Sequence, residues 1–235
     1  MPTTAQKLLL FGAGGETGRE VLEQALAAGH HVRAVEHSWP DGPLPDRDGL
    51  ERREADLITD DLSDLTEGVD AVISAVGLGR SPKTLIDPPP LYTEGAVRMV
   101  QAMRAHGVER LVVISAAFVD DDVDVPHWFR ASAMLPLRNI FRQMAEMERV
   151  LRATESIRWT AARAGWLLDL PATGDYEVSG DGLPRGTLRT RHADLADFLL
   201  KTALGDDWVR QTPHVARAEE SRYQTPPALI DELRP

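Results

Sequence analysis

Three evenly spaced glycines near the start of the chain limit most strongly what it can fold into. The apolar run 8–11 leads directly into Gly12, Gly15 and Gly18. A strand that ends in a tight glycine turn, followed by a helix beginning near Glu16, points several backbone N–H groups and the positive end of a helix dipole at one place. Gly12 permits the sharp turn, Gly15 lets a ligand approach the main chain, and Gly18 lets the helix pack against the strand. The segment therefore predicts a site for the pyrophosphate of a dinucleotide.

The spacing of these glycines leaves a second interpretation open. It reads GxxGxxG and not the more usual GxGxxG, because position 17 is threonine. A glycine-rich turn of this kind also occurs in proteins that bind nothing there. The function must therefore be argued from the rest of the chain as well.

The composition indicates a soluble globular protein that depends on a cofactor for any redox chemistry. The chain has 235 residues, of which 43% are hydrophobic, and no long apolar run, which favours one domain or one domain with a small appendage. Cysteine is absent, which excludes disulfides, thiol nucleophiles and cysteine-based zinc or iron–sulfur sites. The short polar start does not look like a signal peptide, so we expect a cytoplasmic protein.

The net charge argues against polyanionic partners. Acidic residues outnumber basic residues, 37 to 26, for a formal net charge of −11. This balance disfavours nonspecific binding to nucleic acid or to an anionic membrane, although it is compatible with a local basic patch. We expect neither nucleic acid nor a membrane as partner, and a monomer or a homodimer.

Strand-like and helix-like segments alternate along the chain. Strands are predicted at 7–12, 31–35, 50–55, 70–76, 110–115 and 158–162, and helices at 17–28, 61–66, 91–106, 137–154 and 193–204. Strands that are apolar on both faces and separated by amphipathic helices require a parallel sheet covered on both sides. The predicted fold class is therefore α/β, a doubly wound parallel sheet of the Rossmann type.

The last third of the chain changes character. We expect one Rossmann domain over residues 1–204, in which 166–191, rich in Gly and Pro, form a small C-terminal substrate lid over the crevice. The polar segment 205–235 is expected to be a loosely ordered tail or an arm used in oligomer contacts. The segment 37–49, with three prolines and two glycines, is expected to be a surface loop.

The segment 12–18, with the sequence GAGGETG, resembles the GATGxTG signature of the atypical short-chain dehydrogenase/reductases. This NAD(P)H-binding group includes NmrA-like proteins and the flavin reductase/biliverdin-IXβ reductase type. Further segments resemble the flavin reductase branch in order and spacing, namely 94–96, 105–110, 115–118, 148–151, 174–176 and 192–195. The resemblance covers residues 7–204 and implies the Rossmann fold with NAD or NADP as the cofactor.

The glycine turn and the resemblance together give a set of candidate cofactor-binding residues. They are Gly12, Gly14, Gly15, Glu16, Thr17, Gly18, Glu36, His37, Asp56, Leu57, Ala75, Val76, Gly77 and Ser115. Asp56 resembles the family residue that contacts adenine, and Gly77 would let the chain pass beside the adenosine ribose. The alternatives are an aspartate that caps a turn or helix and a plain loop glycine.

Glu36 bears on the choice between NAD and NADP. It follows the second predicted strand, where a carboxylate accepts hydrogen bonds from ribose hydroxyls and repels a 2′-phosphate. NADP-preferring relatives usually carry arginine one residue later, where this chain has His37. We therefore expect a preference for NAD. Two alternatives stay open, a phosphate contact through His37 or Arg33 and an exposed glutamate without a ligand.

The chain lacks the acid pair with which related dehydrogenases reduce ketones. Those enzymes use a tyrosine and a lysine four residues later on the helix after the fifth strand. Here tyrosine occurs only at positions 92, 176 and 223, and the long predicted helix offers Phe141, Met144 and Ala145 instead. Hydride transfer to an acceptor that stabilises its own negative charge, such as a flavin, quinone or extended tetrapyrrole, requires less of the protein.

Ser115 and Phe118 are the candidate catalytic residues. Ser115 resembles the family serine beside the nicotinamide and would hydrogen-bond the cofactor amide or an acceptor oxygen, the alternative being a strand-end serine satisfied by the backbone. Phe118 would flank the ring pocket or simply pack in the core. The aromatic run 127–129 is expected in a loop over the crevice, where it would stack on a planar substrate, pack in the core or contact a second subunit. Arg163 is expected to be structural.

We expect no metal site. The acidic run Asp120, Asp121, Asp122 and Asp124 lacks the glycine and the distal glutamate of a calcium loop, and is expected to be a solvated loop. The histidines lack metal-site spacing, and no GxSxG elbow indicates a serine hydrolase.

The sequence therefore predicts an NAD(P)H-dependent oxidoreductase that transfers hydride to a planar, conjugated or flavin-like small molecule. Two alternatives stay open, a noncatalytic NmrA-like sensor of the dinucleotide state and a tailoring reductase of secondary metabolism. For the tailoring reductase, the loop 39–49 and the aromatic run 127–129 would shape the substrate site.

Overall fold

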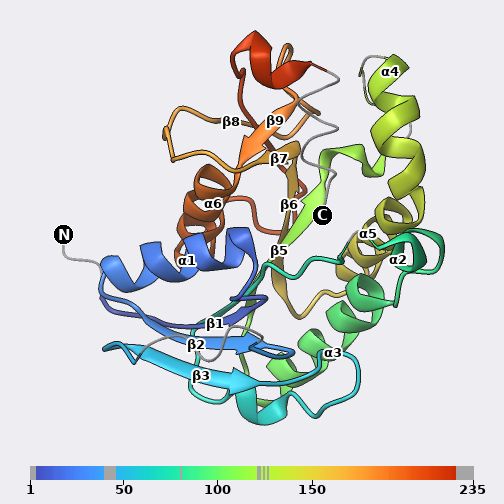
Figure 1. Cartoon of the computed structure of the whole chain (residues 1–235). Helices are drawn as coiled ribbons and strands as arrows, with labels where there is room; N and C mark the ends of the chain where they lie inside the picture. Colours follow the sequence, from blue (N-terminus) through green and yellow to red (C-terminus); the bar gives the residue numbers. More distant parts are fainter. Residues whose placement is uncertain are drawn as a thin grey trace.

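A central sheet of eight strands forms the core of the protein (Figure 1). Its strands are β1 (Lys7–Phe11), β2 (His31–Glu36), β3 (Leu50–Glu54), β4 (Ala71–Ser74), β5 (Arg110–Ala116), β6 (Arg158–Ala164), β8 (Glu177–Ser179) and β10 (His214–Ala216). The computed structural model describes residues 4–39, 46–79, 81–120, 123, 125 and 127–225. The strand order is β3-β2-β1-β4-β5-β6-β10-β8, and neighbouring strands are parallel except for β10 and β8. The order 3-2-1-4-5-6 is that of a Rossmann sheet, which confirms the predicted fold class.

Helices cover both faces of this sheet. They are α1 (Glu16–Ala27), α2 (Pro82–Ile86), α3 (Leu91–Ala105), α4 (His127–Phe129), α5 (Leu135–Arg152) and α6 (His192–Leu204). A separate two-stranded sheet pairs β7 (Trp166–Leu168) with β9 (Arg189–Arg191). Within the described part of the chain, none of the helices has the length and apolar character that crossing a bilayer requires.

The alternation of side chains along the strands explains the two layers. In β1, Leu8 and Leu10 pack with α1 and α6 on one face, whereas Leu9 and Phe11 pack with α3 and α5 on the other. All four side chains are almost fully buried. A strand that is apolar on both faces therefore lies in the middle of the sandwich, as its sequence indicates.

The chain changes faces between β1 and β4. Helix α1 follows β1 on one side of the sheet, whereas α2 and α3 follow β4 on the other (Figure 1). Such a switch point leaves a crevice outside the carboxyl ends of the two strands. Gly12 lies at this crevice with a φ of +77°, and a Cβ there would lie 2.8 Å from the main chain of Ala75.

The aromatic run 127–129 is not in a loop, as the sequence led us to expect. It forms α4, which continues through a wide π turn at Arg130–Met134 into α5. Phe129 is fully buried, and its ring centroid lies 5.2 Å from that of Phe118 and 5.4 Å from that of Trp166. Burial of this ring favours the longer helix, and such contacts between distant segments are not visible in the local sequence.

The segment 205–225 is also not the loose tail that we expected. Strand β10 inserts between β6 and β8, and Val215 and Ala216 are fully buried. The expected lid 166–191 contributes β7, β8 and β9, and of its residues Trp166 and Leu167 line the cavity described below. Residues 40–45 of the expected surface loop and 226–235 of the expected tail lie outside the described residues.

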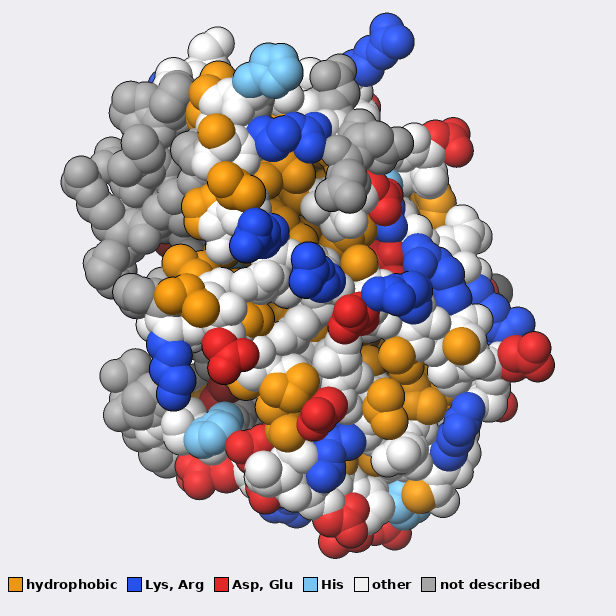
Figure 2. Space-filling model, turned by 90° about the vertical axis from the view of Figure 1, so that its right-hand side faces the viewer, with side chains coloured by type: hydrophobic (Ala, Val, Ile, Leu, Met, Phe, Trp, Pro, Cys, Tyr) orange, Lys and Arg blue, Asp and Glu red, His pale blue; other side chains and the backbone are white. Residues whose placement is uncertain are grey.

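The face built by α3 and α5 is mixed in character. In Figure 2, acidic and basic side chains are interspersed with hydrophobic ones on this side of the molecule. Ile86 of α2 and Leu135 of α5 are 78% and 59% exposed. Helix α5 is amphipathic: its outward side carries exposed arginines, and its apolar side faces the sheet.

The contact between α1 and the glycine turn gives a testable prediction. A Cβ at Gly18 would lie 1.9 Å from the carbonyl oxygen of Gly12. Gly18→Ala should therefore lower the free energy of unfolding by about 2 kcal/mol or more, measured by urea denaturation. Gly79→Ala is the control, because a Cβ at Gly79 meets nothing within 4 Å. Equal stability of the two variants would contradict the described contact.

Candidate active site

A cavity of about 640 Å³ opens at the carboxyl ends of the parallel strands, a size typical of small-molecule and cofactor sites. One half follows the glycine turn and the loops after β2, β3 and β4, and its lining includes Gly12, Gly15, Glu16, Thr17, Glu36, His37, Asp56, Leu57, Ile58, Ala75, Val76, Gly77 and Leu78. The other half lies between the ends of β5 and β6 and helix α5, and its lining includes Ser115, Ala116, Phe118, Leu137, Ile140, Phe141, Met144, Ala164, Gly165 and Trp166. Apart from Gly14 and Gly18, the candidate site residues named from the sequence line this cavity.

The N-terminus of α1 faces the first half of the cavity. Gly15 is the N-cap residue, and no side chain of the cap accepts a hydrogen bond from the first turn. The N–H group of Gly15 is bonded to the carbonyl oxygen of Gly12, which closes the turn at 3.2 Å. The remaining N–H groups of the first turn and the positive end of the helix dipole form a candidate anion-binding site, called the anion place below.

Glu36 connects the end of β2 to the glycine turn. Its Oε2 accepts a hydrogen bond of 2.7 Å from the N–H group of Gly14. Of the two residues, only Glu36 lines the cavity. The carboxylate therefore lies beside the glycine turn. Its contact with a ribose stays a prediction.

Asp56 has the capping role that we named as its alternative. Its Oδ1 accepts hydrogen bonds from the N–H groups of Ile58 and Thr59, at 2.7 and 3.2 Å. Its Oδ2 lies 3.5 Å from Nε2 of the exposed His37. Asp56 and His37 both line the cavity, so the capping role does not remove them from a ligand's reach.

His192 lines the cavity, although it was not among the candidate cofactor-binding residues. As the first residue of α6, it joins α6 to the first turn of α1. Its Nδ1 lies 2.7 Å from Oγ1 of Thr17, and its Nε2 lies 2.8 Å from a carboxylate oxygen of Glu16. The partners are about 175 residues apart in sequence, and no local spacing signals such a contact.

The second half of the cavity has an apolar, aromatic wall. Phe118 packs against Phe141 and Trp166, with ring centroids 5.7 and 6.5 Å apart. Phe118 thus lines the cavity and belongs to the core, and its contact with a ring of the cofactor or acceptor stays a prediction. Phe129 belongs to the core, and Trp128 packs edge-on against it at 5.9 Å.

Helix α5 supplies one side of this wall through a regular stripe. Leu137, Ile140, Phe141 and Met144 follow the spacing i, i+3, i+4, i+7 and line the cavity. Their spacing marked a helix in the sequence, but only the position of α5 over the ends of β5 and β6 shows that the stripe faces a cavity. Trp166 was predicted only as the first residue of the lid 166–191, since no motif marks it as part of this wall.

Tyr92 of α3 also lines the cavity. The residue is buried, and this burial raises the pKa of the Tyr92 phenol to about 12. Tyr92 therefore keeps its proton at neutral pH and is a weaker acid than an ordinary tyrosine.

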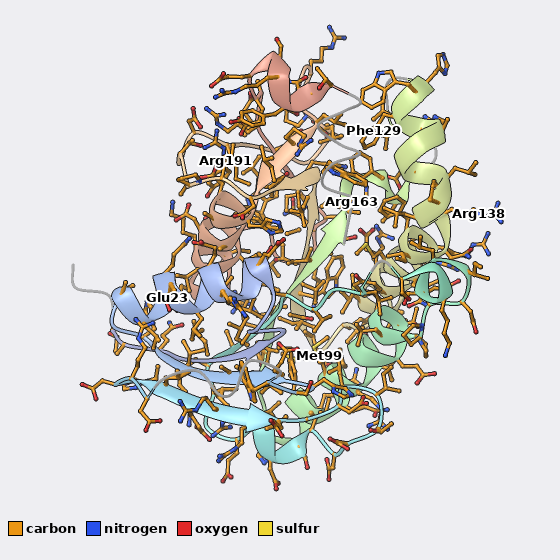
Figure 3. The ribbon with its side chains drawn as sticks, in the orientation of Figure 1. Glu23, Met99, Phe129, Arg138, Arg163 and Arg191 are labelled. Carbon is orange, nitrogen blue, oxygen red and sulfur yellow. The ribbon has the colours of Figure 1, made fainter. Side chains whose placement is uncertain are left out.

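A buried network of charges lies behind Ser115. Oγ of Ser115 lies 2.7 Å from Oε1 of Glu148 on α5, and both residues are 1% exposed. Nε and Nη2 of Arg163 donate to the two oxygens of Glu148 at 2.9 and 2.8 Å. Arg163 also pairs with Asp120, and Arg152 donates to Oε2 of Glu148 at 2.8 Å. Figure 3 labels Arg163 in this network and also Arg138, which points away from the sheet.

The network gives Arg163 the structural role that we expected. Burial lowers the pKa of Arg163, but the hydrogen bonds that it donates to the carboxylates of Glu148 and Asp120 outweigh this effect and raise its pKa overall. Of the acidic run, Asp121, Asp122 and Asp124 lie outside the described residues. In the part of the chain that the structure describes, His, Asp and Glu side chains do not gather in threes as metal ligands do.

His214 of β10 lies beside this network. It is the register partner of Arg163 in the sheet, and its Nδ1 is buried without a hydrogen-bond partner. Burial and then the positive charge of Arg163 lower the pKa of His214 below its ordinary 6.5, although Asp120, Glu148 and a backbone hydrogen bond with Ser179 act in the opposite direction. The imidazole is therefore held neutral in the fold.

Comparison with known proteins identifies the family. The model of a family described as NAD(P)H-binding matches residues 12–205. The chain belongs to this NAD(P)H-binding family. The match includes the glycine turn and both halves of the cavity, and it confirms the family resemblance and the cofactor class, NAD or NADP.

One relative is similar to this chain in sequence, and two solved structures are similar to it in fold. A 3-diazoavenalumate denitrifying reductase from Streptomyces is 30% identical over 211 residues, a match that covers 75% of this chain and 61% of that protein. A candidate NADH-flavin reductase from Streptococcus pneumoniae has a TM-score of 0.71 and 23% identity, covering 91% of this chain and 100% of that one. A short-chain dehydrogenase/reductase from Veillonella parvula in complex with NADP has a TM-score of 0.73 and 15% identity, covering 90% and 94%. Both solved structures share the Rossmann fold of this NAD(P)H-binding protein.

The environment of His214 predicts how stability depends on pH. Because its pKa is lower in the folded than in the unfolded chain, unfolding takes up a proton below the ordinary pKa of 6.5. Its contribution to stability is therefore complete above that pH and is lost as the pH falls through the folded pKa. When the pH is lowered from about 7 to about 5, the free energy of unfolding should fall less in the His214→Asn variant than in the natural chain, as measured by urea denaturation. Parallel pH profiles would contradict this assignment.

Proposed function

We propose that this protein is an NAD(P)H-dependent reductase that transfers hydride to a planar, conjugated acceptor. The observation that carries the proposal is the continuity of the cavity from the N-terminus of α1 to the aromatic wall. A dinucleotide whose pyrophosphate lies at α1 and whose adenosine lies beside Glu36 has its nicotinamide near Ser115. The wall formed by Phe118, Phe141 and Trp166 then borders the place for the acceptor.

The chemistry of the second half supports an acceptor that needs no strong acid. When bound, NAD(P)H supplies the hydride. The side chains with which α5 lines the cavity, Leu137, Ile140, Phe141 and Met144, are all apolar and supply no acid. Tyr92 is a weak acid in its buried position. The protein's contribution is to place two flat rings in contact and to exclude water from them. Flavins, quinones and similar conjugated molecules fit this division of labour.

The first half supports NAD over NADP. The Glu36 carboxylate lies at the cavity and is held by Gly14, and Asp56 adds a second carboxylate nearby. These two carboxylates repel a 2′-phosphate, whereas they can accept hydrogen bonds from the hydroxyl groups of a ribose. His37 lies close to Asp56 and offsets the repulsion of a 2′-phosphate only in part.

One observation favours a tailoring reductase as a second candidate. The relative from Streptomyces is named as a reductase of a diazo compound, 3-diazoavenalumate. A similar role for this protein would use the same cavity and the same hydride, with a conjugated natural product as acceptor. The two candidates differ in the acceptor and not in the mechanism.

The proposed reaction is tested by mixing the protein with NADH or NADPH and a panel of flavins, quinones and aryl diazo compounds. We expect the absorbance of the reduced nicotinamide to fall much faster with protein and acceptor together than with either alone. Binding of dinucleotide, measured by calorimetry, without turnover on any acceptor would contradict the reductase and favour a dinucleotide sensor.

The role of Glu36 is tested by reversing its charge. Glu36→Arg should shift the ratio of affinities toward NADPH by about tenfold, because it replaces repulsion of the 2′-phosphate by attraction. Glu54→Arg is the matched control, because Glu54 is the exposed register partner of Glu36 on the next strand. An unchanged preference in Glu36→Arg would mean that Glu36 does not face the ribose.

A further inference from the structure

Glu148 is surrounded by hydrogen-bond donors on both of its oxygens. Oε2 accepts from Arg163 and Arg152, both at 2.8 Å, and Oε1 accepts from Arg163 at 2.9 Å. A carboxyl group with cationic donors on both oxygens is ionised, and an ionised carboxylate only accepts hydrogen bonds. The remaining contact, between Oε1 and Oγ of Ser115 at 2.7 Å, therefore has a fixed direction. Ser115 donates its proton to Glu148.

This direction determines what Ser115 can do toward the cavity. A serine hydroxyl has one proton and two lone pairs. Because the proton is committed to Glu148, only the lone pairs are available to a ligand. We propose that Glu148 is a positioning residue that makes Ser115 a hydrogen-bond acceptor in the cavity, so that the site selects a ligand with an N–H group there and receives no proton from Ser115.

The construction of the network supports a role beyond stability. Burying ions is unfavourable unless they are paired, and a well-packed apolar group in their place is often at least as stable. Glu148 continues the cavity stripe of α5 one turn beyond Met144, where an apolar residue would maintain the pattern. A carboxylate at this place, held by Arg163 on its inner side, delivers one oxygen to the only hydroxyl group of β5.

Two kinds of ligand N–H can reach Ser115. One is the carboxamide N–H of the nicotinamide, and the other is the ring N–H of a flavin-like acceptor. The inference rests on the proposed function, since both groups belong to the proposed ligands. The test therefore has two arms, one for each source.

In the first arm, binding of NAD is compared with binding of its 3-acetylpyridine analogue, which lacks the carboxamide N–H. In the second arm, KM is compared for lumiflavin and 3-methyllumiflavin, which lacks the ring N–H. We expect the natural chain to prefer the N–H ligand by roughly two- to tenfold in one of the arms. Ser115→Ala should abolish that preference.

Glu148→Gln should abolish the same preference by another route. An amide in place of the carboxylate favours its oxygen at the position of Oε2, where two arginines donate. Its NH₂ group then takes the position of Oε1 beside Ser115, where Nε of Arg163 loses its acceptor. The hydroxyl then turns its own proton toward the cavity. Glu146→Gln is the matched control, because Glu146 lies on the same helix, is half-exposed and pairs with Arg149 and not with the buried network, and it should keep the preference.

The outcomes separate this inference from the function on which it rests. Should Glu148→Gln fail to fold, as shown by circular dichroism, Ser115→Ala alone decides the matter. Dinucleotide binding in which Ser115→Ala leaves both ratios unchanged overturns the inference and leaves the proposed function standing. An absence of dinucleotide binding by the natural chain overturns both.

Discussion

The close contact between Gly18 and the main chain of Gly12 determines where the rest of the site lies. It lets α1 start directly over the end of β1, so that the first N–H groups of the helix meet the crevice between β1 and β4. On the other side of Gly12, the main chain of Ala75 at the end of β4 lies so close that a Cβ at Gly12 would not fit. Any side chain at these glycines separates elements whose contact forms the anion place, which is why the motif constrains both the fold and the ligand.

Polarity divides the cavity into two unlike parts. The first part offers backbone N–H groups and the carboxylates of Glu36 and Asp56, and the second offers aromatic and aliphatic side chains. A charged diphosphate loses its hydration in an aromatic site without compensation, so the first part suits the diphosphate of the proposed dinucleotide better than the second part does. The apolar second part suits a flat, uncharged ring.

The sequence predicted the parts of this architecture that local patterns encode. Buried strands with alternating faces gave the sheet, and the turn 12–18 gave the anion place, because both depend on residues close together in the chain. The helix that begins at His127 was not predictable, since burial of Phe129 depends on Phe118 and Trp166 from other elements. For the same reason the contact of His192 with Thr17 and the pairing of Glu148 with Arg163 could not be found in the sequence. The role of a charged residue within an apolar stripe, such as Glu148, can be interpreted only when its partner in the fold is known.

The insertion of β10 beside β6 has a consequence for the synthesis of the protein. Translation produces β6 long before residues 214–216, and until these are made one edge of a fully buried strand has no neighbour. An uncovered edge of this kind pairs readily with other chains. A pause in translation between α6 and β10 therefore leaves the edge of β6 uncovered for longer, and a molecular chaperone that covers this edge would protect the growing chain during the pause.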